Sequence, residues 1–173
     1  MIKKIGALLV VVLALSGLAS ATTKEFSMGH FYLTPQLGYA SWGGIPFGVN
    51  AEYAITDNIG VGGTVMAQFW SYGWGTASWI TFSAEANYHF IQIPVDKLDV
   101  YAGAGLGYGI YSFSYASGWD MGSTGTSGIT LQAIVGARYY FSPKIAGSLR
   151  IATPFLGSFT GFGAAVGVTF LLK

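Results

Sequence analysis

The sequence predicts an all-β fold: a transmembrane, antiparallel up-and-down barrel of eight strands that follows a cleaved signal peptide. Three observations predict it. Eight stretches alternate apolar residues with small or polar ones, and this period of two places successive side chains on opposite faces of a strand. Charged residues make up only 9% of the chain and are nearly absent from these stretches. After the N-terminal segment, no apolar run approaches the roughly 20 residues that a membrane-spanning helix needs.

The N-terminal segment, residues 1–21, has the three parts of a secretory signal peptide. Two lysines form a basic start, an apolar run covers Ile5 to Leu15, and Ala19-Ser20-Ala21 is a small-residue cleavage site. The apolar run is short for a membrane anchor. We therefore expect export, cleavage after Ala21, and a single barrel domain over residues 22–173.

The fifth predicted strand, residues 98–110, shows the alternation most clearly. Its even positions hold leucine, valine, alanine, tyrosine and isoleucine, whereas its odd positions hold aspartate, tyrosine and glycine. One face therefore suits hydrocarbon and the other suits a narrow lumen. The eight strands are expected over residues 29–41, 47–55, 59–70, 78–90, 98–110, 128–141, 145–153 and 161–172.

The other strands repeat this division between a lipid face and a lumen face. Expected on the lipid face are Phe31, Leu33, Leu37 and Tyr39 in the first, Phe47, Val49, Ala51, Tyr53 and Ile55 in the second, Ile59, Val61, Val65, Ala67 and Phe69 in the third, Ile80, Phe82, Ala84, Ala86, Tyr88 and Phe90 in the fourth, Ile129, Leu131, Ala133, Val135, Ala137, Tyr139 and Phe141 in the sixth, Leu149 and Ile151 in the seventh, and Phe162, Ala164, Val166, Val168, Phe170 and Leu172 in the eighth. The residues between them are mostly Gly, Ser, Thr, Asn and Gln.

The scarcity of charge separates this fold from a soluble exported β-protein. A soluble sandwich or a lipocalin-like binder also alternates, but its polar face meets water and is usually rich in lysine, glutamate and aspartate. Here that face carries small, amide and aromatic residues. The membrane barrel is therefore favoured, and the lipocalin-like binder is the less favoured alternative.

The connections between strands predict how the barrel is oriented. Short turns are expected at 56–58, 91–97 and 142–144, and the other set of connections at 42–46, 71–77, 114–127 and 154–160. An even strand count places both termini on the side of the first set. Since bacterial barrels have short periplasmic turns and longer external loops, we expect periplasmic termini.

The mature chain resembles the small eight-stranded outer-membrane barrels of the OmpA and OmpX types. The resemblance is carried by the strand count, the aromatic strand end Tyr139-Tyr140-Phe141, the glycine-rich Ala102-Gly103-Ala104-Gly105 and the signal peptide. It differs at the C-terminus, where Phe170-Leu171-Leu172-Lys173 replaces the usual terminal aromatic. The resemblance implies a monomer in the lipid of a bacterial outer membrane, inserted by the barrel assembly machinery.

Four ionisable residues are expected to face the lumen in one layer: Glu52, Glu85, Arg138 and Arg150. Strand order places Glu52 opposite Arg138, which leaves Glu85 to pair with Arg150. An unpaired buried charge costs several kcal/mol, so each charge needs a partner. The layer is interpreted as a structural plug, or alternatively as a gate whose ion pairs exchange to open a narrow channel or small-ligand path.

Aromatic residues are expected in the external connections: Trp42, Tyr72, Trp74, Tyr115 and Trp119. They suit either anchoring at the lipid headgroups or stacking against sugars or another cell surface. No catalytic or metal-binding constellation is expected, because the two histidines lie near the periplasmic end and cysteine is absent. No cofactor is expected, and the absence of a basic stripe argues against nucleic acid. The sequence thus predicts a non-enzymatic barrel with a structural or surface-interaction role.

Overall fold

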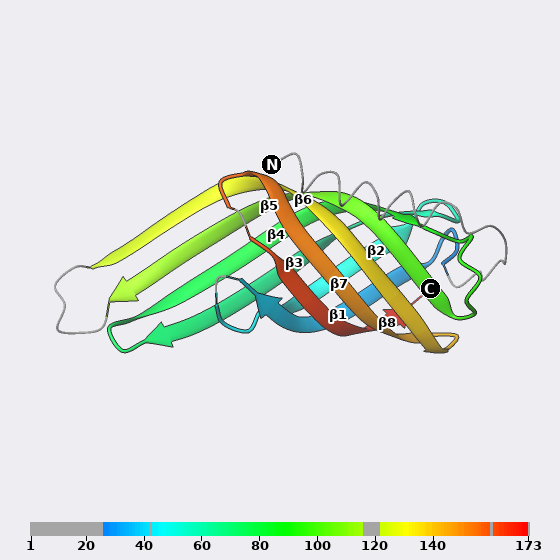
Figure 1. The fold of residues 1–173 in the computed structure, drawn as a ribbon, viewed down its shortest axis with the longest axis horizontal. Helices are drawn as coiled ribbons and strands as arrows, with labels where there is room; N and C mark the ends of the chain where they lie inside the picture. Colours follow the sequence, from blue (N-terminus) through cyan, green and yellow to red (C-terminus); the bar gives the residue numbers. More distant parts are fainter. Residues whose placement is uncertain (1–25, 42, 116–121, 160, 173) are drawn as a thin grey trace.

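The chain folds into a closed barrel of eight antiparallel strands, each paired with its neighbour in sequence. In the computed structural model, the structure describes residues 26–41, 43–115, 122–159 and 161–172. The predicted signal peptide, Trp42 and Trp119 lie outside these residues. The strands are β1 (Phe31–Ala40), β2 (Phe47–Ala54), β3 (Ile59–Tyr72), β4 (Gly75–His89), β5 (Leu98–Tyr115), β6 (Ser123–Ser142), β7 (Ile145–Gly157) and β8 (Gly163–Leu171) (Figure 1).

Pairing of β1 with β8 closes the barrel, so the predicted fold class is confirmed. The first and last described residues lie at the same end as the connections after β2, β4 and β6. We call this the terminal end and the opposite end the loop end. Within the described residues, no helix has the length and apolar character needed to cross a membrane.

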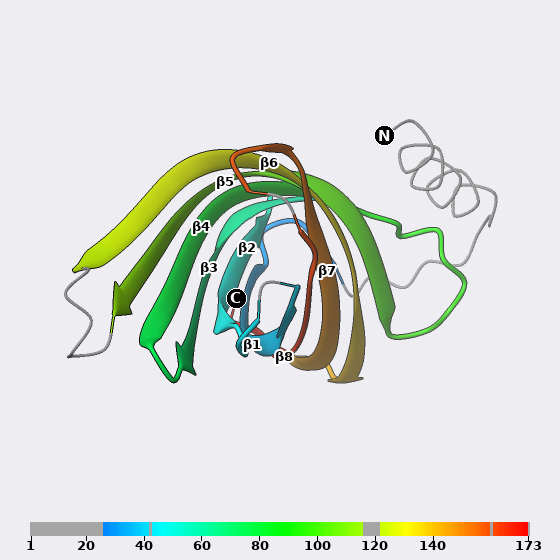
Figure 2. The ribbon, with the colours of Figure 1, turned by 60° about the vertical axis from the view of Figure 1, so that its left-hand side comes forward.

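The four middle strands are longer than the sequence predicts. β3 to β6 continue past the rest of the barrel at the loop end and form a projecting sheet (Figure 2). The predicted connections at 71–77 and 114–127 are therefore wrong in large part: only Gly73 and Trp74 separate β3 from β4, and β6 already begins at Ser123. β7 likewise extends to Gly157, into the connection predicted at 154–160.

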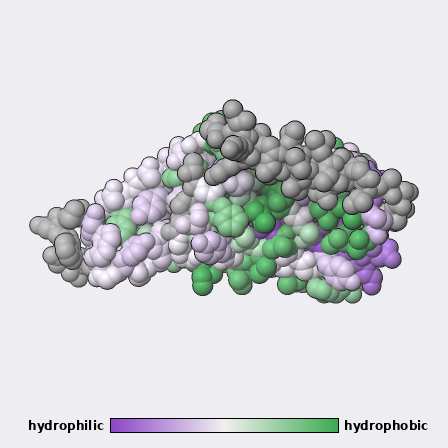
Figure 3. Space-filling view, viewed as in Figure 1, coloured by the Kyte–Doolittle hydropathy of each residue, from purple (hydrophilic) through white to green (hydrophobic). Residues whose placement is uncertain are grey.

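The cross-strand register explains why hydropathy missed these extensions. On the outward face of β3 to β5, five successive cross-strand rows are apolar or small, from Ile59–Tyr88–Ala102 up to Ala67–Ile80–Ile110. On β6 the outward apolar residues run from Val135 to Ile129. The next outward rows change to Phe69–Ser78–Ser112–Gly125 and Ser71–Thr76–Ser114–Ser123. The strands continue, but apart from Phe69 their outward residues become small and polar. The apolar band therefore ends where the projecting sheet begins (Figure 3).

This boundary predicts a depth-dependent cost of charge on the outward face. Ala84 is exposed in the middle row of the apolar band, opposite Leu106. Replacing it with arginine should cost about 2–4 kcal/mol in free energy of unfolding, because the charge would lie near the centre of the bilayer. Ser114→Arg, on an exposed position of the projecting sheet, is the matched control and should change it little. Urea unfolding in lipid vesicles measures both, and equal losses would contradict the proposed boundary.

Candidate functional site

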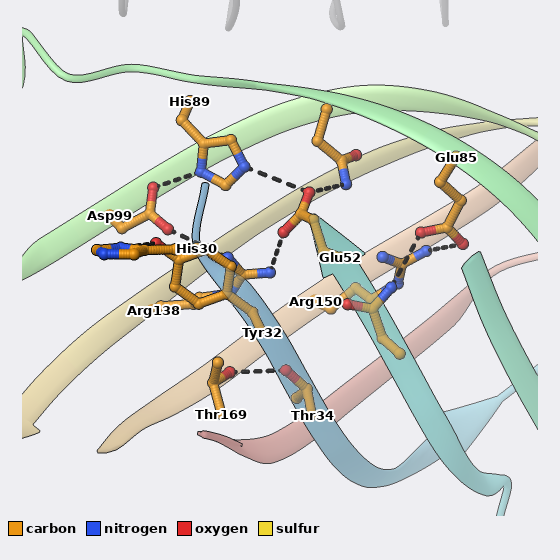
Figure 4. A network of polar contacts seen from close by, with 12 residues as sticks. His30, Tyr32, Thr34, Glu52, Glu85, His89, Asp99, Arg138, Arg150 and Thr169 are labelled. Carbon is orange, nitrogen blue, oxygen red and sulfur yellow. Dashed lines mark hydrogen bonds and ion pairs between the residues drawn. The ribbon is translucent and has the colours of Figure 1, made fainter. Parts of the chain in front are cut away.

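The lumen near the terminal end contains a buried cluster of ionisable side chains around Arg138. The Arg138 guanidinium contacts Glu52 through Nη2 and Asp99 through Nη1, the latter at 3.4 Å (Figure 4). His89 joins the same two carboxylates, with Nδ1 at 2.7 Å from Asp99 and Nε2 at 3.3 Å from Glu52. Asn87 donates a further hydrogen bond of 2.7 Å to Glu52. We call Glu52, Asn87, His89, Asp99 and Arg138 the inner cluster.

The inner cluster is closed to solvent by aromatic rings. The rings of Tyr32 and Tyr101 lie 5.2 and 5.0 Å from Arg138 Cζ, within the range of cation–π attraction. The Tyr101 ring occupies the space that a side chain at Gly136 would need, so this glycine makes the arrangement possible. Arg138 is consequently only 1% exposed. A guanidinium this deeply buried depends on both carboxylates for its stability.

A second ion pair lies nearer the loop end. Arg150 Nη2 is 2.7 Å from Glu85 Oε1, and Glu85 also accepts hydrogen bonds from Ser83, Asn50 and Gln132. Residues of several strands therefore donate hydrogen bonds to the Glu85 carboxylate. We call Glu85 and Arg150 the outer pair.

The terminal end of the lumen is filled by Phe26, which precedes β1. Its ring stacks on the His89 ring with centroids 3.5 Å apart and lies 5.2 Å from the Tyr32 ring. Phe26 is 2% exposed and belongs to a packed group with Tyr32, Ala54, Tyr140, Ala146 and Leu171. Apolar packing therefore lies directly beneath the inner cluster.

The structure brings Glu52 to Arg138 and Glu85 to Arg150, the two pairings inferred from strand order. The two ion pairs lie in separate groups instead of the single layer that the sequence predicts. Sequence reasoning missed Asp99, although this residue lies on the lumen face of its predicted strand and that position was the signal. It placed His89 near the periplasmic end without giving it a role, and nothing in the alternation pointed to Phe26.

Three of the predicted aromatic residues, Tyr72, Trp74 and Tyr115, belong to a continuous group on the inner face of the projecting sheet. Tyr72 stacks on Trp74 at 5.5 Å, and Trp74 packs against Phe113 and Tyr115 at 4.9 and 6.1 Å. Trp70 and Tyr111 extend the group toward the lumen. We call Trp70, Tyr72, Trp74, Tyr111, Phe113 and Tyr115 the aromatic face. Tyr72 and Tyr115 thus lie in strands, which corrects their predicted place in loops.

The aromatic face is inward because it shares register rows with lumen residues. Trp79, a 7% exposed lumen residue, is the cross-strand partner of Tyr111, and the fully buried Ala77 is the partner of Phe113. The face is nonetheless open at its tip, where Tyr72 and Trp74 are about half exposed. These rings therefore point to the inner side of the projecting sheet, away from the outward apolar band.

Comparison with known proteins identifies relatives in structure but not in sequence. No protein-family model matches the chain, and no curated protein matches its sequence. Among solved structures, the N-terminal β-barrel domain of Pseudomonas aeruginosa OprF is similar with a TM-score of 0.62 and 16% identity, over 84% of this chain and 98% of that one. A major outer-membrane protein of Thermus thermophilus gives 0.60 and 15%, over 83% and 98%.

The attachment invasion locus protein Ail of Yersinia pestis is also similar, with a TM-score of 0.57 and 15% identity over 83% of this chain and 98% of that one. These identities establish a shared architecture and leave activity open. The strand count, the closed antiparallel sheet and the outward apolar band agree with the same architecture. The chain is therefore a transmembrane β-barrel with the fold of the small eight-stranded outer-membrane barrels of the OmpA and OmpX types.

Proposed function

We propose that this protein is a monomeric, non-enzymatic barrel of the outer membrane, with periplasmic termini, a closed lumen and an interaction surface directed outward. The burial of the inner cluster is the observation that supports a closed lumen. Arg138, Glu52 and His89 are each at most 1% exposed, whereas a water-filled path would hydrate these charges. Phe26 supports the same proposal, because its ring covers His89 from the terminal end.

The alternative is a narrow channel that opens when ion-pair partners exchange. Such exchange needs a vacant partner within reach, but Glu52 already bonds Arg138, His89 and Asn87, and Arg138 holds a second carboxylate. Moving any member strips several contacts from a buried charge at once. The geometry therefore favours a plug over a gate.

Single-channel recording tests the closed lumen. The mature chain, refolded into planar lipid bilayers, should give no steady conductance steps, and Glu52→Gln should remain silent because Phe26 and the tyrosine rings still fill the end. Insertion is verified by protection of the barrel from added protease, with a known porin as the positive control. Discrete steps from the native chain, or their appearance in Glu52→Gln, would favour the channel.

The aromatic face supports the surface-interaction role. Its exposed tip, Tyr72 and Trp74, presents two stacked rings at 47% and 49% exposure, and hydroxyl groups of Thr124 and Thr126 occupy the same inner rows. The strand residues 70–78, 111–115 and 122–128 contain no charged side chain. Ail has been solved with the heparin analogue sucrose octasulfate, a polyanion. Because the aromatic face offers no cation, we infer an uncharged partner, such as a neutral saccharide, that stacks on the rings.

Titration of the nanodisc-embedded chain with maltoheptaose and with sucrose octasulfate tests this choice. Tryptophan fluorescence should respond to the neutral sugar and not to the sulfated one, and Trp74→Ala should weaken the response at least fivefold. Phe69→Ala, at an exposed outward position of β3, is the matched control and should leave the response unchanged. A response to the sulfated sugar alone, or to neither sugar, would contradict the assignment.

A further inference from the structure

A cavity of about 130 Å³ lies in the lumen on the loop-end side of the outer pair. Its walls are largely apolar and include Met66, Trp79, Ala152, Pro154 and Phe159. Arg150 and Gln132 also line it, and both bond Glu85. The cavity therefore rests on a neutralised ion pair and is surrounded by apolar side chains.

Two glycines of β5 keep this space open. Gly107 and Gly109 line the cavity, and a Cβ at Gly109 would lie 3.0 Å from the Phe159 ring and 3.3 Å from Trp79 Nε1. Phe159 and Trp79 pack against each other in a T-shaped contact at 4.5 Å beside this glycine. Protein interiors are otherwise close-packed, and an apolar cavity of about 150 Å³ is enough to hold a benzene ring. The space thus suits a molecule whose apolar part is about one ring in size.

Polar groups of the cavity define the rest of the ligand. Gln68 lines it at 4% exposure, and its Nε2 has no hydrogen-bond acceptor among the described residues. Gln36 also lines it, and its Nε2 donates to the weak acceptor Met66 Sδ at 3.2 Å. A buried donor without an acceptor is unfavourable, and an acceptor on a ligand removes that penalty. Since Glu85 already neutralises Arg150, no additional charge is needed.

We propose that this cavity binds a small uncharged molecule with a ring-sized apolar body and an oxygen that accepts a hydrogen bond from the Gln68 amide. The aromatic face leads to it, because Trp79 lines the cavity and contacts Tyr111 of that face at 6.0 Å. A ligand therefore reaches it from the loop end. The site is independent of the closed lumen and of any saccharide at the tip.

Two probes of the same shape separate the apolar and polar contributions: acetophenone, which has a carbonyl oxygen, and α-methylstyrene, which has a methylene group in its place. The mature chain in lipid nanodiscs is titrated while the indole N–H resonance of Trp79 is followed by NMR. We expect a saturable shift with acetophenone and about tenfold weaker binding of α-methylstyrene, the ratio that one hydrogen bond of about 1.4 kcal/mol provides.

Three variants complete the test. Ala152→Leu should abolish the shift by filling the cavity, since Ala152 is the cross-strand partner of the buried Ile134. Ala104→Leu, on an exposed outward position, is its matched control. Gln68→Leu should equalise the two probes. A non-saturable shift that persists in Ala152→Leu would mean bilayer partitioning only and would overturn the site, and equal affinities in the native chain would overturn the role of Gln68.

Discussion

Replacing Arg138 with methionine should lower the free energy of unfolding by roughly 3–5 kcal/mol, the range found when one partner of a buried ion pair is removed. Methionine fills a similar volume and keeps the apolar contacts with the flanking tyrosine rings. What it removes is the positive group between two carboxylates that are themselves almost inaccessible to solvent. The loss of stability therefore reflects the unpaired charge of the carboxylates and not a cavity in the packing.

The outer pair supplies the comparison for this prediction. In Arg150→Met, Glu85 loses one ion pair but keeps Ser83, Asn50 and Gln132 as hydrogen-bond partners. Its destabilisation should therefore be clearly smaller than that of Arg138→Met. Urea unfolding of both variants in lipid vesicles measures the difference.

A double variant identifies the cause of the Arg138 effect. Adding Glu52→Gln to Arg138→Met removes one of the two carboxylates left without the guanidinium, while Asp99 keeps its contact with His89. Part of the lost stability should return. If the double variant is less stable than Arg138→Met, the explanation by unpaired charge fails.

The alternation of the sequence was sufficient to predict the barrel and the inward or outward direction of its side chains. Outward positions such as Leu37, Phe82 and Phe141 are exposed, and inward positions such as Thr34, Gln36 and Asn87 are buried. A period of two fixes the face of every later residue once one is known, provided that no bulge intervenes. The described bulges lie in the pairing of β6 with β7.

The projecting sheet shows where hydropathy stops predicting strands. In residues 71–78, 111–115 and 122–128 the outward side chains are small or polar, and the aromatic rings point inward. Backbone pairing continues regardless of this change, because the ladder of hydrogen bonds does not depend on which face is apolar. A prediction that relies on an apolar lipid face therefore ends the strands at the edge of the apolar band.

The inner cluster could be predicted only in part, because a strand pattern gives the face but not the neighbour across the lumen. Glu52 and Arg138 were paired from strand order alone. Asp99 shares their face, yet its contact with Arg138 depends on side-chain length and on the space above Gly136. Phe26 lies outside any strand, so no periodicity indicates that it turns into the lumen.

Phe26→Ala should lower the free energy of unfolding by about 3–5 kcal/mol, the range for truncating a buried phenylalanine. The side chain is 2% exposed and stacks on His89 and Tyr32, and the chain beside it is held by a hydrogen bond from Ser27 N to the Tyr32 hydroxyl. Removing the ring deletes the apolar cover of the inner cluster from the terminal end. Both the packing and the exclusion of water from His89 should therefore be lost.

Met28→Ala is the matched control, because Met28 lies two residues away and is 67% exposed. It should leave stability and the His89 environment unchanged. Exchange of the His89 ring protons with water, followed by NMR in nanodiscs, should become faster in Phe26→Ala and stay slow in Met28→Ala. If Phe26→Ala unfolds like the native chain and His89 stays protected, the segment before β1 does not seal the lumen. The closed state would then rest on the inner cluster and its tyrosine rings alone.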